Sequence, residues 1–190
     1  MKYSIYAKRL IAILFTIFFL LYIAYKPYHG VMEFKGVVKS LFLLYFFIIS
    51  QTLGIIHEGG HGVCYILNCP QFITALNGTI FQWGIPLLVG LYYKKRANYI
   101  AYYISLFILA ISIDYTSWYI STANEGLYLP ASKSFLGVDG YHDFNYILSR
   151  IGLLNYYEII SIVVKIGSIA LMLYSYFMLM LNSLLFKEES

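Results

Sequence analysis

Apolar stretches of about 20 residues recur along this chain, and short polar clusters separate them. A helix needs about this length to cross the hydrocarbon core of a bilayer. The chain is 61% hydrophobic and only 12% charged, whereas a typical soluble domain carries about 25% charged residues. Backbone polar groups in lipid must be satisfied within a helix or a closed barrel. The sequence therefore predicts an all-α integral membrane protein, with residues 1–190 forming one polytopic domain in the cell membrane.

We expect five or six transmembrane helices. Asn68, Cys69 and Pro70 should end the second of them, because proline cannot continue a helix. The next stretch, 71–80, is interpreted as a short extended hairpin with a turn at Asn77 and Gly78. The predicted spans are 8–26, 37–67, 79–93, 99–120 and 157–186, and 142–153 is a further short helix. With five crossings, the loop after the second helix and the loop before the last one share a side.

Charged and aromatic residues fit lipid rather than nucleic acid as a partner. The net charge is only +4, and the lysines and arginines lie beside apolar stretches, where lipid phosphates are found. The 21 tyrosines agree with this, because tyrosine is favoured at membrane interfaces. The two cysteines, Cys64 and Cys69, are too few for a disulfide framework, although the two can be close in space.

A short motif near the end of the second predicted helix carries the chemistry. It reads His57, Glu58, Gly59, Gly60, His61. Positions i and i+4 share one face of a helix, so both imidazoles can bind one zinc ion. The glutamate lies beside them and can take a proton from a water on the metal. Ionisable groups at membrane depth are costly and usually functional, which favours a metal site over a chance match.

A catalytic zinc normally has three protein ligands and a water, so a third ligand must come from elsewhere. His142 begins a predicted helix that faces the end of the second helix. Asp143 adjoins it and can ligate instead, orient a histidine, or cap the helix. Asp139 and Asp114 are further carboxylate candidates, and Asp114 lies about as deep in its helix as His57 does in its own.

A single amide, Gln82, enters the third predicted helix just after the expected turn. Its side chain can donate a hydrogen bond to an oxyanion that develops during peptide hydrolysis. It can equally hold an extended peptide, or serve as an ordinary hydrogen-bond partner between helices.

These residues resemble the site-2 protease family of intramembrane zinc metalloproteases. In that family a Gly-Pro-x-x-Asn segment follows the histidine motif, and a later Asp-Gly supplies the third ligand. Gly78 and Gln82 stand where the glycine and asparagine stand, with Thr79 in place of proline. Asp139 with Gly140 matches the Asp-Gly pair.

The chain resembles more closely a group of small prokaryotic membrane proteins. They share His-Glu-x-Gly-His, then Gly-x-x-x-Gln-x-x-x-Pro, then His-Asp-aromatic-Asn-Tyr. The second pattern falls on Gly78, Gln82 and Pro86, and the third on 142–146. The resemblance covers about 50–155, within a metalloprotease-like core of about 37–155, and it favours His142 or Asp143 over Asp139 as third ligand.

Together, the motifs predict a zinc metalloendopeptidase that cleaves membrane proteins or membrane-proximal peptides. His57 and His61, with His142 or Asp143, would hold Zn²⁺, and Glu58 would be the general base. Gln82 would assist as a catalytic or substrate-binding residue. One alternative is a proteolytically inactive zinc-binding membrane scaffold. Another is a metal transporter, which the scarcity of polar groups in the far half of the spans disfavours.

Overall fold

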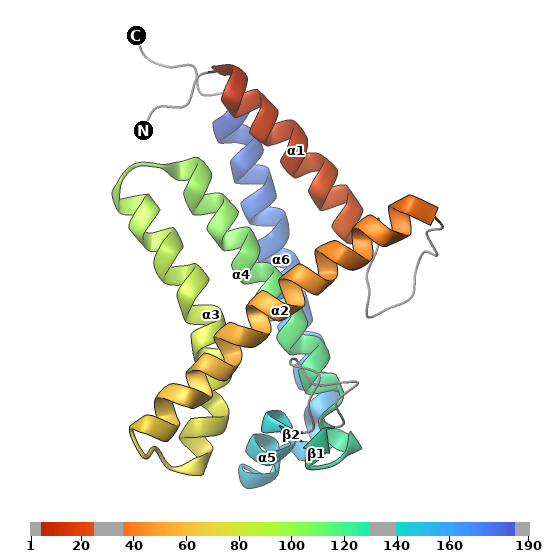
Figure 1. Ribbon diagram of the computed structural model, residues 1–190, viewed down its shortest axis with the longest axis vertical. Helices are drawn as coiled ribbons and strands as arrows, with labels where there is room; N and C mark the ends of the chain where they lie inside the picture. Colours follow the sequence, from red (N-terminus) through yellow and green to blue (C-terminus); the bar gives the residue numbers. More distant parts are fainter. Residues whose placement is uncertain (1–4, 25–35, 130–139, 185–190) are drawn as a thin grey trace.

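The computed structural model describes residues 5–24, 36–129 and 140–184, and these form an all-α architecture with one very short hairpin (Figure 1). The predicted helical class is confirmed. The elements are α1 (Ile5–Ala24), α2 (Gly36–Ile66), α3 (Gln71–Lys95), α4 (Tyr99–Ser121), η1 (Ala123–Glu125), β1 (Tyr128–Leu129), β2 (Gly140–Tyr141), α5 (Asp143–Arg150), η3 (Leu154–Tyr156) and α6 (Tyr157–Leu184).

Three helical segments in the described part of the chain are long and apolar enough to cross a membrane. They are Gln71–Lys95, Tyr99–Glu125 and Leu154–Ser183. In the middle one, 67% of an apolar 18-residue stretch is buried inside the protein, against 28% and 22% in the other two. Helix α4 is therefore the centre of the bundle, and α3 and α6 keep broad apolar faces outward.

Helices α4 and α6 pack closely through small residues. Ser117 Oγ donates to the carbonyl of Ser161 at 2.9 Å, and Ser161 Oγ donates back to the carbonyl of Ser117 at 2.8 Å. Ser168 and Ser175 follow Ser161 at seven-residue intervals and are also buried. Small residues at such spacing let two helix backbones approach, so this seam fixes α6 against the central helix.

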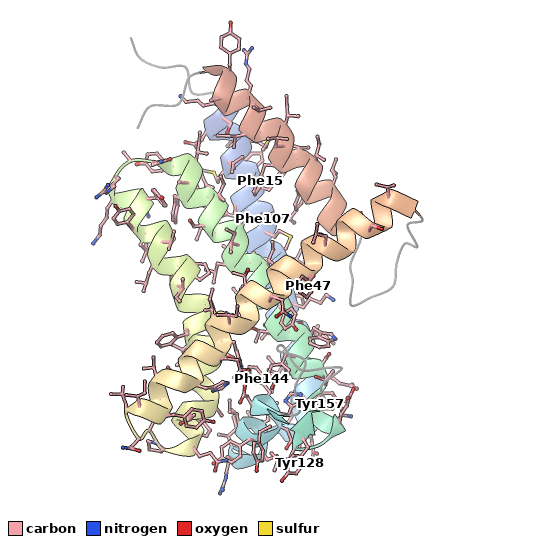
Figure 2. The ribbon with its side chains drawn as sticks, in the orientation of Figure 1. Phe15, Phe47, Phe107, Tyr128, Phe144 and Tyr157 are labelled. Atoms are coloured by element: carbon pink, nitrogen blue, oxygen red, sulfur yellow. The ribbon has the colours of Figure 1, made fainter. Side chains whose placement is uncertain are left out.

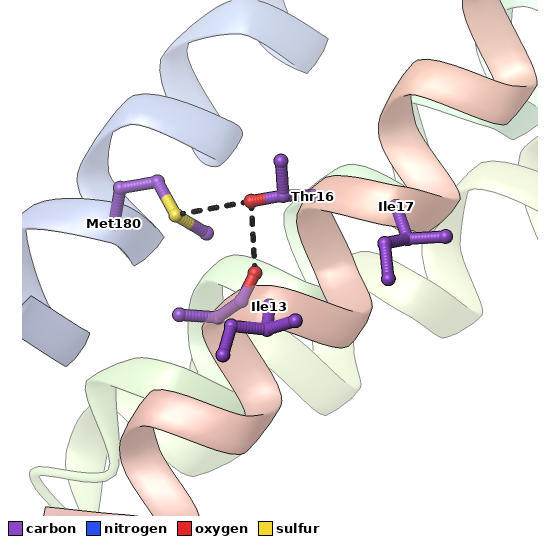
Figure 3. A pocket seen from close by; sticks show the side chains of 5 residues that line it. Ile13, Thr16, Ile17 and Met180 are labelled. Carbon is purple, nitrogen blue, oxygen red and sulfur yellow. Dashed lines mark hydrogen bonds between the residues drawn. The ribbon is translucent and has the colours of Figure 1, made fainter.

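Aromatic rings attach α1 to the same bundle (Figure 2). Phe15 meets Phe107 of α4 edge to face at 4.7 Å between centroids, and Phe19 stacks on Tyr176 of α6 at 4.3 Å. A shallow apolar groove remains between α1 and α6, where Thr16 Oγ1 donates to the sulfur of Met180 (Figure 3). The residues that line this groove belong to α1 and α6 and include none from α2, α3 or α5.

The prediction of an extended hairpin over 71–80 is wrong, because α3 is helical from Gln71 onward. Pro70 starts the helix: its φ is −55° and its carbonyl accepts from the Thr74 N–H at 3.0 Å. Asn77 and Gly78, a turn signal in isolation, lie inside α3 and pack against α2. Tertiary contacts thus override the local preference.

The ends of the helices bring three segments to one end of the molecule. The α2–α3 turn lies there, and α5 with the hairpin lies beside it (Figure 1). In the hairpin, Tyr128 pairs with Tyr141 in antiparallel register. The expectation that the end of α2 and the start of α5 meet is confirmed by the contacts of His57 and His61 with Asp143.

Candidate metal centre

Close approach of two helix backbones builds the floor of the site. Asn77 Nδ2 donates to the carbonyl of Gly60 at 2.7 Å, which ties α3 to α2. A Cβ on Gly60 would collide with the backbone carbonyl of Asn77, so α2 needs glycine at this contact. The crossing places Gly78 directly against the imidazoles of His57 and His61, and it leaves no room there for a side chain at residue 78.

Three ligand atoms converge above this floor. His57 Nε2 lies 2.9 Å and His61 Nε2 3.2 Å from the same carboxylate oxygen, Oδ2 of Asp143. All three side chains are buried. Ligand atoms around a tetrahedral zinc with bonds of about 2.0–2.1 Å lie roughly 3.3 Å apart. The two nitrogen–oxygen distances are close to those of a metal-ligand set, and the ligand atoms of the three residues all lie within 4.8 Å of one another.

The far nitrogen of each imidazole has a partner that fixes its proton. His61 Nδ1 lies 2.7 Å from the carbonyl oxygen of Thr74, which only accepts, so this nitrogen carries the proton. His57 Nδ1 lies 3.1 Å from Oε1 of Gln82 and donates to it in the same way. Each neutral ring then turns the lone pair of Nε2 toward Asp143. Partners of this kind orient the histidine ligands of metal sites.

These protonation states leave three electron-rich atoms facing one another. Burial raises the pKa of Asp143, and hydrogen bonds from His57 and His61 lower it by more. Such bonds need a proton on one of the facing Nε2 atoms, which is the arrangement available to the cluster without a metal. One proton can bridge only two of the three atoms, whereas a divalent cation can bind all of them. Two imidazoles and a carboxylate are a donor set that zinc accepts.

The room left by Gly78 agrees with this interpretation. A Cβ at that position would lie 2.7 Å from both His57 Nε2 and His61 Nε2. A side chain at residue 78 would therefore occupy the space that a metal ion bound to the two nitrogens needs. The residues present fit a bound metal ion.

Helix α5 places Asp143 in the cluster. The Tyr119 hydroxyl of α4 accepts the backbone N–H of Asp143 at 3.1 Å, and the His142 N–H donates to the carbonyl of Leu127 at 2.8 Å. The carboxylate is therefore held from both sides by backbone bonds, one from the central helix and one from the segment leading into the hairpin.

His142 lies outside the cluster, and both of its ring nitrogens are engaged elsewhere. It is the N-cap of α5: Nδ1 accepts the Asn145 N–H at 3.3 Å, and Nε2 lies 3.1 Å from Thr122 Oγ1. Its ring stacks on Tyr119 with centroids 4.3 Å apart. Burial lowers the pKa of His142 to about 4, so the ring is neutral at pH 7. The structure brings Asp143, rather than His142, to the two histidines of α2.

The remaining sequence candidates are dispersed. Glu58 is half-buried and adjoins His57 on α2. Asp114 lies on α4, outside the group of three ligand atoms. Asp139 lies outside the described residues. Gln82 is 1% exposed, and its Oε1 is committed to His57, so it holds a ligand in place.

Two parts of the site had no clear signal in the sequence. The Thr74 carbonyl is a backbone group that any residue could supply, so only the position of α3 identifies it. Tyr119 is one of 21 tyrosines, and nothing in its surroundings marks it out. A glycine inside an amphipathic stretch is a weak signal of close packing, and Gly78 gave that signal but was interpreted as part of a turn.

Comparison of the chain with models of protein families, with curated proteins and with solved structures found no match.

The Gln82 contact leads to a prediction. Gln82→Leu removes the acceptor of His57 Nδ1 while keeping an apolar chain of similar length, so zinc should bind about 10–100-fold more weakly, the usual cost of losing such a partner. Competition with a chromophoric chelator measures this affinity. Ser112→Ala is the control, because Ser112 Oγ donates to the backbone carbonyl of Gln82 rather than to its amide. Unchanged zinc affinity would mean that Gln82 does not position His57 for a metal ion.

Proposed function

We propose that this protein is a zinc-dependent metallopeptidase that acts on membrane proteins or membrane-proximal peptides. The observation that carries the proposal is the approach of His57 Nε2 and His61 Nε2 to Asp143 Oδ2, in a buried group whose ligand atoms lie within 4.8 Å of one another. Glu58 follows the first of these ligands directly in the sequence. The three residues would hold the ion, and a fourth coordination position would stay open for water, as in catalytic zinc sites.

A bound zinc ion in such a site supplies Lewis acidity to a water molecule and to the peptide carbonyl. Glu58 accepts the proton of the attacking water at its carboxylate and then delivers it to the nitrogen of the leaving amine. Gln82 and the Thr74 carbonyl keep the two imidazoles in the tautomer that presents Nε2. Tyr119 and the N-cap of α5 hold the backbone of Asp143 in place, so that its carboxylate faces the two histidines.

The surroundings of the cluster support a membrane substrate. The three ligands are buried among helices of which three are long and apolar enough to cross a membrane. A transmembrane helix hides its peptide bonds in its own hydrogen bonds, so a substrate segment must unwind before attack. Extended substrates can add to the edge of a sheet. The stretch 71–80, predicted to be extended, cannot supply such an edge because it is helical.

Two other functions remain distinguishable by experiment. A zinc-binding scaffold would use the same three ligands and would not need Glu58. A metal transporter needs further ligands along a path across the bundle. Asp114, the candidate for such a path, is not part of the cluster. The peptidase interpretation is preferred because Glu58 adjoins the cluster on the same helix.

Glu58→Gln is the direct test. The substitution keeps the size of the side chain and removes its capacity to accept a proton, so zinc content should be unchanged and peptide cleavage should fall by about 10²–10⁴-fold. Cleavage is followed by mass spectrometry on purified protein in detergent, with a library of single-span helical peptides as substrates.

Glu125→Gln is the matched control, because Glu125 is an exposed carboxylate in η1 beyond the end of α4. It should retain wild-type cleavage. Equal cleavage by wild type and Glu58→Gln would exclude Glu58 as the base. Zinc binding without cleavage of any library member by either protein would favour the scaffold.

A further inference from the structure

The end of α2 closes with a left-handed turn that brings its two flanking residues together. Asn68 has φ of +52°, and the Cys69 N–H donates to the carbonyl of Cys64 at 2.9 Å. A bond that spans five residues across one left-handed residue is the mark of a Schellman motif. In that motif the side chains at the two bonded positions usually touch. Here both of those positions are cysteines.

The two thiols are suited to react with each other. Cys64 is 3% exposed, whereas Cys69 is half-buried and thus within reach of a small reagent. A hydrogen bond with the Cys64 thiol raises the pKa of Cys69. The two sulfurs therefore lie close together, although the raised pKa reduces the fraction of Cys69 present as the reactive thiolate. The chain contains these two cysteines and no others, so each is the other's sole partner within one chain.

We propose that Cys64 and Cys69 form a reversible intramolecular disulfide at the α2–α3 turn, closed by exchange with low-molecular-weight disulfides. The Cys69 thiolate attacks one sulfur of the small disulfide and expels one small thiolate. The Cys64 thiolate then attacks Cys69 in the mixed disulfide and expels the second. One protein dithiol and one small disulfide thus become one protein disulfide and two small thiols, and the two electrons pass to the small disulfide.

The turn that this bond would close borders the metal centre. Helix α2 carries His57 and His61 on one side of the turn, and α3 carries the Thr74 carbonyl that binds His61 on the other side. Thr74 Oγ1 also contacts the carbonyl of Cys69 at 3.4 Å. Because the Schellman motif already brings the two cysteines together in the reduced protein, the disulfide should form without moving the histidines. It would lock the turn.

Thiol counting in glutathione buffers tests this proposal without zinc and without a cleavage assay. The full chain in detergent, with a chelator present, is equilibrated at graded ratios of oxidised to reduced glutathione. It is then denatured, alkylated with a maleimide and weighed by mass spectrometry. We expect wild type to pass from two alkylated thiols to none, with the loss of two hydrogens, no glutathione adduct and no crosslinked dimer. In separate native samples of the reduced and oxidised protein, freed of chelator, zinc should bind to the same extent.

Substitutions in the turn test its geometry. Cys64→Ser should stop at a glutathione adduct on Cys69. Asn68→Gly, which adopts positive φ freely, should close as wild type does, whereas Asn68→Val disfavours that conformation and should accumulate the adduct. Accumulation of the adduct in wild type, disulfides between chains, or two free thiols in fully oxidised glutathione would overturn the proposal. None of these outcomes bears on whether Glu58 is a catalytic base.

Discussion

Asp143→Asn is expected to lose the zinc that His142→Asn keeps. The aspartate oxygen lies 2.9 Å and 3.2 Å from the two histidine nitrogens, whereas His142 uses both ring nitrogens to cap α5 and to meet Thr122. Wild type should contain about one zinc per chain, as expected for a site with three protein ligands. Removing the carboxylate should bring the content of the purified protein to near zero, and activity should be lost with it.

Both substitutions introduce asparagine, and each should preserve the fold. At position 143 the new amide can donate N–H groups to the two facing lone pairs, which satisfies the cluster without a metal. At position 142 asparagine is itself a good N-cap, so α5 keeps its start. Elemental analysis of the detergent-purified proteins, covering iron as well as zinc, measures the result. Zinc retained by Asp143→Asn and lost by His142→Asn would reverse the assignment of the third ligand.

Much of the helical architecture could be predicted from composition and spacing alone. The apolar stretches and their polar ends place α1, α2, α4 and α6 within a few residues of their observed limits. The limits of these helices follow from where apolar stretches give way to polar residues, and that change can be read from the local sequence. The start of α3 could not be predicted in this way, because Asn77 and Gly78 are turn residues in isolation. In the helix they pack against Gly60 of α2, a contact that no local pattern in the sequence reveals.

In the site, too, the residues on one helix could be predicted from the sequence, whereas the third ligand depends on contacts between distant segments. His57, Glu58 and His61 were visible because one helix fixes their spacing. The choice between His142 and Asp143 depends on which of two adjacent residues faces α2, and adjacent residues at the start of a helix point in directions that differ by about 100°. That direction is set by the cap of α5 and by Tyr119, which lies 24 residues upstream of Asp143. No local pattern encodes it.

Gly78→Ala is expected to abolish zinc binding although the substitution adds a single methyl group. The new Cβ would lie 2.7 Å from both His57 Nε2 and His61 Nε2, closer than non-bonded carbon and nitrogen atoms approach. The methyl would stand in the space that the ion shares with these nitrogens. Alanine also raises helix propensity by about 1 kcal/mol over glycine. Loss of zinc should therefore occur without loss of helix content, as measured by elemental analysis and circular dichroism.

Gly84→Ala is the matched control, because it makes the same change on the same helix where a Cβ meets nothing within 4 Å. It should keep full zinc content and gain the same increment in helix propensity. A Gly78→Ala protein that still binds one zinc would mean that α2 and α3 separate readily at their crossing. That outcome would contradict the tight crossing that the Asn77–Gly60 hydrogen bond indicates. If zinc is instead lost in Gly78→Ala and kept in Gly84→Ala, the ion lies between the imidazoles and the backbone of α3.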